Sequence, residues 1–340
     1  MKEKEMTEAT HHQCKQCEFY TKIKYTLDVL DDRVKSIKPP PGEVPRLKDI
    51  EISGMSLAKE GVTGGDHIIY IDFNKRYDLN ARKKKIEEKW QKEMKDFSPQ
   101  EQLDNPYIQK KKKEKDEKMA GLKKNRTRAG VLVADVKGHD ESGSFIVGML
   151  HQSFLTGALY EMKTYGKITT NLFEKINTRF YNSSSVDDFF TMIYGEISEN
   201  GKFLFISAGH PPPLVFSNEG DHFLDVPEDK IFNYPPIGVM PSRKDIDATL
   251  NKSVFGYKQA YKISKLDLMG SGDILLLYTD GLSELENSEG ERLFPHHLEK
   301  VLKENKALSA KEICSAVKKA IDDFCKEPDD DITYVIIKKN

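Results

Sequence analysis

Apolar residues recur along the chain in two patterns, as short continuous runs and as longer stretches with helical spacing. Short runs bounded by turn residues are typical of buried strands, and stretches with apolar positions three and four apart are typical of helices. The predicted helices are residues 144–160, 170–181 and 309–325. The predicted strands lie in "KDIEISGMSLA", "HIIYIDF", "VLVA", "FTMIYGEI", "KFLFISAGH", "GDILLLYTDG" and "PDDDITYVIIKK". The mixture indicates an α+β fold.

A lysine-rich segment interrupts this pattern. Residues 81–126 hold 16 Lys and Arg against 9 Asp and Glu, although the whole chain has a formal charge of only −2. Ser98-Pro99-x-Glu101 is a capping box with a first-turn proline, and it predicts the start of a second helix. We therefore expect a charged helical hairpin inserted at residues 76–128. Its apolar stripe consists of Ile86, Trp90, Met94 and Phe97.

The length, the N-terminus and the cysteines narrow the class of protein. A chain of 340 residues can bury a large core. Its first twenty residues are polar, no apolar run is long enough for a membrane span, and four cysteines are typical of a reducing compartment. We predict a cytoplasmic protein without membrane contact, with an N-terminal helical or linker segment at residues 1–45 and one folded domain at residues 46–340. His11, His12, Cys14 and Cys17 could form half of a zinc site, but this is a weaker interpretation because the chain has no second CxxC motif.

Four aspartates stand at the ends of predicted strands. Asp66 follows a Gly-Gly turn and begins one strand, whereas Asp135 ends another. If these two strands pair antiparallel, the two carboxylates meet. Asp280 likewise ends a strand, and Asp330 stands just before one. Each aspartate taken alone is equally well explained as an ordinary turn residue, but two such pairs together favour a shared site.

Oxygen ligands of this kind suit hard divalent cations such as Mg²⁺ or Mn²⁺. Two ions about 3.5–4 Å apart can activate a water molecule and hold a phosphoryl group for in-line attack. Glycines beside the aspartates would let backbone and phosphate approach closely. The carboxylates therefore predict a two-ion site for phosphoryl chemistry.

Six sequence blocks, in order, carry a resemblance to a known family. The chain resembles the metal-dependent protein phosphatases (PPM, type 2C), and within them the bacterial SpoIIE/RsbU branch, over residues 45–340 apart from the inserted hairpin. The blocks are "GVTGGDHIIYIDF", "VLVADVKGHD", "FTMIYGEI", "FISAGHPPPLVF", "GDILLLYTDGLSE" and "DDDITYVII".

This resemblance implies a PPM-type β-sandwich of two antiparallel sheets flanked by helices, with two Mn²⁺ or Mg²⁺ ions at one end. It implies hydrolysis of phosphoserine or phosphothreonine by a metal-activated water, without a covalent phosphoenzyme. By the same resemblance, Asp135 bridges both ions and Val136 offers its backbone carbonyl. Asp280 and Asp330 supply further ligands, and Asp66 holds the site directly or through water.

Other positions near these blocks are weaker candidates. Lys59 is a candidate phosphate contact, although a solvated lysine explains it as well. Asp331 is a poorer candidate ligand than its neighbour, and His210 is interpreted as a packing residue in a turn. Asp140 stands where the family usually has glycine; we favour a helix N-cap over added negative charge near the ions.

These features lead to three hypotheses. The first is a serine/threonine protein phosphatase acting on a phosphorylated signalling protein, by resemblance an anti-anti-sigma-type protein in a partner-switching pathway. The second is a catalytically weak phosphoprotein-binding module, which Asp140 favours and the four retained aspartates disfavour. The third is hydrolysis of a phosphorylated metabolite.

The 76–128 arm is interpreted as a regulatory docking element or a solvated decoration. Nucleic-acid binding is not expected, because acidic residues interleave its lysines.

Overall fold

A computed structural model describes most of the chain after its first segment. The described residues are 39–340, except 60–63, 138–140, 184–188, 247–249, 251–252 and 268–269. Asp140 and the cysteine–histidine group at residues 11–17 therefore lie outside them, as does most of the predicted N-terminal segment.

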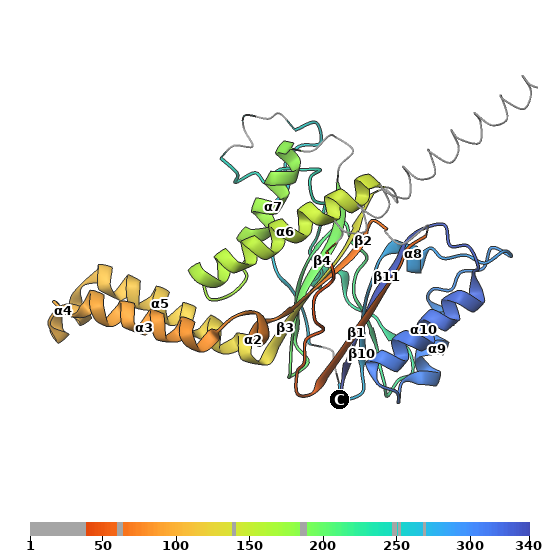
Figure 1. The fold of residues 1–340 in the computed structure, drawn as a ribbon, viewed down its shortest axis with the longest axis horizontal. Helices are drawn as coiled ribbons and strands as arrows, with labels where there is room; N and C mark the ends of the chain where they lie inside the picture. The colour runs from red at the N-terminus through yellow and green to blue at the C-terminus, as the bar shows by residue number, and fades with distance from the viewer. Residues whose placement is uncertain are drawn as a thin grey trace, which may run out of the picture.

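Two β-sheets pack face to face, and helices cover both outer faces (Figure 1). The five-stranded sheet has the order β1-β11-β10-β6-β7 and the other β2-β3-β4-β5-β8, with β9 paired to β5. The expected sandwich is confirmed, and its main ladders are antiparallel; β8 pairs parallel to β5. The first sheet contains β1 (Ile50–Leu57), β6 (Leu214–Phe216), β7 (Phe223–Leu224), β10 (Ile274–Tyr278) and β11 (Ile332–Lys339). The second contains β2 (Asp66–Asp72), β3 (Arg128–Val136), β4 (Phe190–Ser198), β5 (Phe203–Ala208), β8 (Asn233–Tyr234) and β9 (Ser264–Leu266).

Alternation along the strands divides the apolar core into three layers. On β3, Val131 and Val133 point into the space between the sheets, whereas Leu132 and Ala134 join the layer beneath the helices. The period of two in a strand requires this division when both faces are covered. Continuous apolar runs are therefore the correct signature of these central strands.

Two pairs of helices form the outer layers. The buried side chains of the first pair pack on the outer face of the six-stranded sheet, and those of the second pair pack on the outer face of the five-stranded sheet. The first pair is α6 (Glu141–Thr164) and α7 (Thr170–Ser183), and the second is α9 (His296–Asn305) and α10 (Ala310–Phe324). Ser309 and Glu312 form a capping box at the start of α10. No helix among the described residues is long and apolar enough to cross a bilayer.

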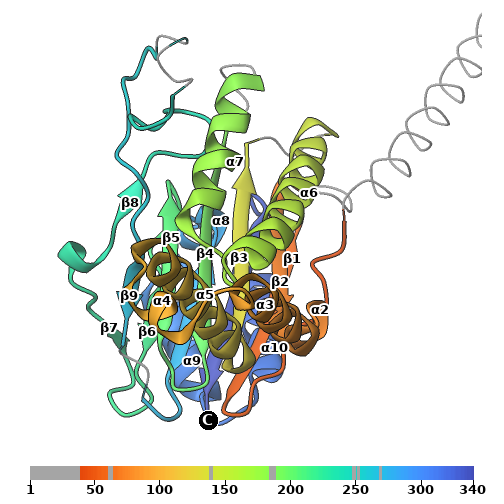
Figure 2. The same ribbon diagram turned by 90° about the vertical axis from the view of Figure 1, so that its left-hand side faces the viewer.

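The lysine-rich segment forms an arm that projects from the sandwich (Figures 1 and 2). The Ser98 capping box is present, with Pro99 in the first turn. The helix it starts is short, because Asn105-Pro106 ends it and caps the next one. Ion pairs Lys111–Glu93 (3.2 Å) and Lys115–Glu87 (3.0 Å) join the two long helices. The arm and its root comprise α2 (Phe73–Arg76), α3 (Leu79–Met94), α4 (Pro99–Asp104), α5 (Pro106–Lys124) and the 3₁₀ turn η1 (Asn125–Thr127).

Candidate active site

The register of β2 and β3 places two of the predicted aspartates opposite each other. Asp66 pairs with Asp135 at one end of the antiparallel ladder. The Val136 N–H donates to the Gly65 carbonyl at 3.2 Å and extends the pairing by one step. The two strands thus bring together carboxylates that are far apart in the sequence.

The other two aspartates come from the five-stranded sheet. The β10–β11 ladder continues past Tyr278, because the Thr279 N–H donates to the Thr333 carbonyl at 2.9 Å. Asp280 then begins the short helix α8 (Asp280–Ser283), and Asp330 lies just before β11. Both residues are therefore at the same end of this strand pair.

A threonine that the sequence interpretation passed over links the two sheets. The Thr279 hydroxyl donates to Asp66 Oδ2 at 2.8 Å and accepts from the Thr333 N–H at 2.9 Å. All three groups are buried. Thr279 directly precedes Asp280 in "YTDG", but nothing in that motif shows that its hydroxyl faces a carboxylate of the other sheet.

The aspartates lie within electrostatic reach of one another. Burial raises the pKa of Asp66 well above its usual range, and the charge of Asp135 adds to the effect. Burial also raises the pKa of Asp135 to about 7, helped by the negative charges of Asp280, Asp330 and Asp331. Without a compensating cation, this arrangement disfavours the ionised forms.

The chemistry of the donors fits hard divalent cations. Asp66 Oδ1 is buried and has no hydrogen-bond partner among the described residues, and such an atom is costly to leave unpaired. A cation would supply both the missing partner and the missing positive charge. Across the described ranges, no three Asp, Glu, His or Cys side chains already converge on one metal position.

Asp331, unlike the candidate ligand Asp330, holds backbone groups in place. Its two carboxylate oxygens accept hydrogen bonds from the Lys59 N–H at 2.8 Å and the Gly65 N–H at 2.6 Å. It thereby ties the segment before β2 to the start of β11. The Lys59 residue is exposed, and its backbone rather than its ammonium makes this contact. Phosphate contact by Lys59 stays a prediction.

Two glycines allow Asp331 to fit. A Cβ on Gly64 would lie 2.1 Å from Asp331 Oδ2, and a Cβ on Gly281 would lie 2.0 Å from the Asp331 carbonyl oxygen. At such distances something must shift: for Gly281 the obstacle is backbone, and for Gly64 it is the Asp331 carboxylate, which two hydrogen bonds hold in place. These glycines are therefore needed for close approach around one aspartate.

Three histidines lie close to this end of the second sheet. His67 Nε2 and His151 Nδ1 form a buried hydrogen bond of 2.9 Å, which joins β2 to α6. His210 is buried, as predicted for a packing residue, and its Nδ1 lies 2.9 Å from the Thr191 hydroxyl. Burial lowers the pKa of His210 to about 3.

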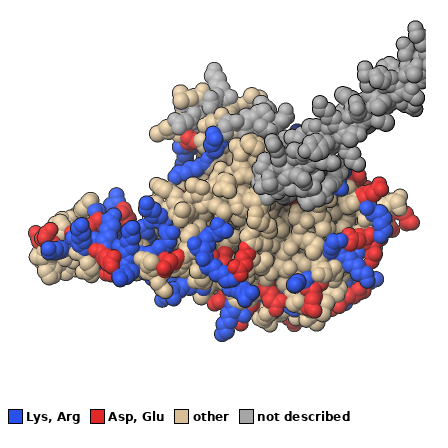
Figure 3. Space-filling view, viewed as in Figure 1, with Lys and Arg blue, Asp and Glu red and all other residues tan. Residues whose placement is uncertain are grey.

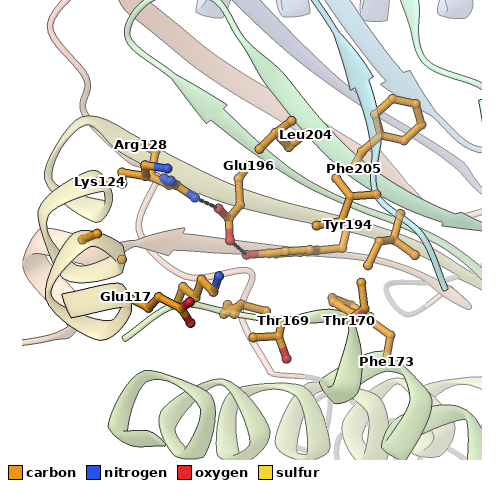
Figure 4. Close-up of a pocket in the computed structure, with 16 residues that line it drawn as sticks. Glu117, Lys124, Arg128, Thr169, Thr170, Phe173, Tyr194, Glu196, Leu204 and Phe205 are labelled. Carbon is orange, nitrogen blue, oxygen red and sulfur yellow. Dashed lines mark hydrogen bonds and ion pairs between the residues drawn. The ribbon is translucent and has the colours of Figure 1, made fainter. Parts of the chain in front are cut away.

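A cavity of about 490 Å³ opens at the opposite end of β3. Arg128 begins that strand seven residues before Asp135, a separation of about 23 Å at ~3.3 Å per residue. Arg128 forms an ion pair with Glu196, which also accepts from the Tyr194 hydroxyl at 3.0 Å (Figure 4). These polar groups satisfy one another, and the cavity is separate from the aspartates.

Comparisons with known proteins agree with this fold. A family model described as Stage II sporulation protein E (SpoIIE) matches residues 125–340. Phosphoserine phosphatase RsbU of Bacillus subtilis (strain 168) is 23% identical over 222 residues, which cover 64% of this chain and 57% of RsbU. Phosphoserine phosphatase RsbP of the same organism is 28% identical over 162 residues, covering 46% of this chain and 34% of RsbP. The chain thus corresponds to part of each relative.

Among solved structures, the SiaA-PP2C domain of Pseudomonas aeruginosa superposes with a TM-score of 0.56 at 13% identity. The match covers 94% of this chain and 98% of that domain. This likeness shows a shared PP2C fold.

Proposed function

The chain belongs to the SpoIIE family, and from this membership we propose that it is a metal-dependent phosphatase of phosphoserine and phosphothreonine in proteins. The observation that carries the proposal is the pairing of Asp66 with Asp135 at the end of the sandwich where Asp280 and Asp330 also lie. These are the four aspartates that the family resemblance selects.

The ligands would come from both sheets. Asp135, with the Val136 carbonyl, would hold ions from the six-stranded sheet, and Asp280 and Asp330 would do so from the five-stranded sheet. Asp66 would contact the ions directly or through a water molecule. Two bound Mn²⁺ or Mg²⁺ ions would supply an activated water and offset charge on the phosphoryl oxygens.

Thr279 and Asp331 would hold the aspartates of the site in position. Thr279 orients Asp66 through a hydrogen bond of 2.8 Å, and such outer partners fix the direction of a ligand. Asp331 holds the segment before β2 against β11 through two backbone N–H groups. The raised pKa of Asp135 means that cation binding would release a proton near neutral pH.

The proposed substrate is a phosphorylated signalling protein. RsbU and RsbP are phosphoserine phosphatases, and the domain that resembles them occupies most of this chain after the arm. By this likeness we favour a small anti-anti-sigma-type phosphoprotein in a partner-switching pathway, with the 76–128 arm as the contact for a regulatory partner.

The first experiment is phosphate release from p-nitrophenyl phosphate with Mn²⁺, with Mg²⁺ and in EDTA. Wild type should turn over only with a divalent cation, and Asp135→Asn should lose that turnover. Asp116→Asn, on the exposed arm, is the matched control and should keep it. Phosphoserine, phosphothreonine and phosphotyrosine peptides and small phosphorylated metabolites then define the substrate class.

A folded wild-type protein without turnover on any of these substrates would contradict the proposal. Binding of a phosphopeptide without its hydrolysis would favour the alternative, a phosphoprotein-binding module. Turnover of metabolites alone would move the substrate class away from proteins.

A further inference from the structure

A second concave site lies where the arm joins the sandwich. It is a groove of about 680 Å³ between α3, α5 and the C-terminal end of α6. Pockets of about 300–1,000 Å³ are the usual size for small-molecule ligands. Six cationic side chains line it, namely Arg76, Arg82, Lys85, Lys89, Lys118 and Lys163.

The positive charge in this groove is largely uncompensated. Asp78 is its only lining carboxylate, and Asp78 accepts the Ala81 N–H at 2.8 Å as the cap of α3. Of the six cations, Lys89 has an ion pair within the described residues, at 3.6 Å to Glu93. Arg82 instead lies over the Tyr77 ring, 5.3 Å from its centroid. Six cations against one carboxylate leave a formal charge of +5.

Lys118 shows that these charges act on one another. Burial lowers its pKa, and the positive charges of Lys89, Arg82 and Lys163 lower it further. These residues belong to α3, α5 and α6, so the repulsion acts across the groove and not along a single helix. A bound anion would relieve this repulsion.

Two of the helices that line the groove, α5 and α6, are joined outside it. Asn125 Nδ2 donates to the Gly166 carbonyl at 3.0 Å, and a Cβ on Gly121 would lie 2.9 Å from the same oxygen. Gly166 has a φ of +69°, a conformation that favours glycine. The end of α5 therefore packs backbone to backbone against the turn after α6, which fixes the helices that carry Lys118 and Lys163 relative to each other.

Apolar side chains complete the groove. Ile86 of α3 and Leu159 and Met162 of α6 line it beside the cations. Such a surface suits the flat face of a ring system, while arginine and lysine side chains suit phosphate oxygens.

We propose that this groove binds a nucleotide-like small molecule that carries several phosphates on a partly apolar body. A nucleoside triphosphate has a charge near −4, comparable with the +5 of the groove. Lysine and arginine residues gather over the arm and its junction with the sandwich (Figure 3), but the groove is where they converge from four helices, α2, α3, α5 and α6. The site is independent of the proposed phosphatase activity.

The test is calorimetric titration of the full chain with ATP, pyrophosphate and adenosine. EDTA is present throughout, so that no divalent cation at the aspartates can recruit phosphate. We expect ATP to bind at micromolar concentration, and adenosine and pyrophosphate each to bind at least tenfold more weakly. The affinity for ATP should fall with rising salt.

The variants are Lys118→Gln and the double variant Arg82→Gln/Lys118→Gln. Lys118→Gln removes repulsion, so it should stay folded and melt at or above the wild-type temperature; the double variant also gives up the Arg82–Tyr77 contact and should stay folded. The affinity for ATP should fall at least tenfold in each. Lys113→Gln removes one charge from an exposed position on α5 and should bind ATP like wild type. Failure of wild type to bind ATP, equal weakening by Lys113→Gln, or tighter binding of polyglutamate than of ATP would each overturn the proposal.

Discussion

Asp66 and Asp135 face each other across the last register position of β2 and β3, and both carboxyl groups have raised pKa values. A pair of like charges at such a position destabilises a sheet unless something neutralises it. This cost is the physical reason to expect cations at this end of the sandwich.

Mn²⁺ should therefore raise the melting temperature of the wild-type protein. Binding to the folded state alone stabilises by about 2.7 kcal/mol at a concentration 100 times the dissociation constant. Asp135→Asn should lose most of this rise, yet in EDTA it should melt about 2 °C or more above wild type, because it removes repulsion. Thermal unfolding with and without Mn²⁺ measures both effects, and a variant that melts lower than wild type in EDTA would argue against the repulsion.

Thr279→Ala should weaken Mn²⁺ binding or Mn²⁺-dependent turnover about 10- to 100-fold, the usual effect of losing an outer hydrogen-bond partner. It should also cost about 1–3 kcal/mol of unfolding free energy, because the Thr333 N–H and Asp66 Oδ2 lose their partner. Thr279→Ser keeps the hydroxyl and should recover most of the metal response. If wild type and the alanine variant bind Mn²⁺ with equal affinity, Thr279 has no role in positioning the metal ligands.

Gly64→Ala should disrupt the site through Asp331. The new Cβ would lie 2.1 Å from Asp331 Oδ2, so the carboxylate must move away from the Lys59 and Gly65 N–H groups. We expect at least a tenfold loss of turnover and about 1–3 kcal/mol of stability, the range for overpacking. Pairing the variant with Asp331→Ala tests the mechanism: in the double variant the two losses should be less than additive.

Acidification should destabilise the fold through His210. Its folded-state pKa of about 3 lies below the unfolded value near 6.5. Between these pH values the unfolded state binds more protons, so stability falls by up to about 1.4 kcal/mol per pH unit as the pH drops. Urea unfolding at pH 7.5 and pH 5.5 should show a smaller loss for His210→Gln than for wild type. His222→Gln, on an exposed histidine, should behave like wild type; equal losses in all three proteins would exclude His210 as the cause.

Glu174→Gln should destabilise the attachment of residues 258–261 to α7. Lys258 Nζ lies 2.8 Å from Glu174, and its side chain is only 2% exposed. Glu174 also accepts the Tyr261 N–H at 2.6 Å. Glutamine keeps an acceptor oxygen but removes the negative charge, so the buried ammonium loses its counter-ion, at a cost of about 3 kcal/mol. Asp322→Asn breaks the exposed Lys318 pair and should cost less than about 0.5 kcal/mol; similar losses in the two variants would contradict this reasoning.

The sequence by itself determined the central strands, most of the long helices and the ends at which the aspartates stand, but not α9 or the short strands β6 to β9. Continuous apolar runs defined the central strands because both of their faces are covered, and capping boxes at Ser98 and Ser309 marked helix starts through local hydrogen bonds. The opposition of Asp66 and Asp135 could also be predicted, since an antiparallel pair brings the start of one strand beside the end of the next.

Only the tertiary structure decided contacts between the sheets and between the arm and the sandwich. Thr279 reaches Asp66 across 213 positions of sequence, and Lys118 meets Lys163 because α5 packs against the turn after α6. Local patterns encode which face of an element is buried. They do not encode which polar groups two packed layers bring together, since that depends on how whole elements lie against each other.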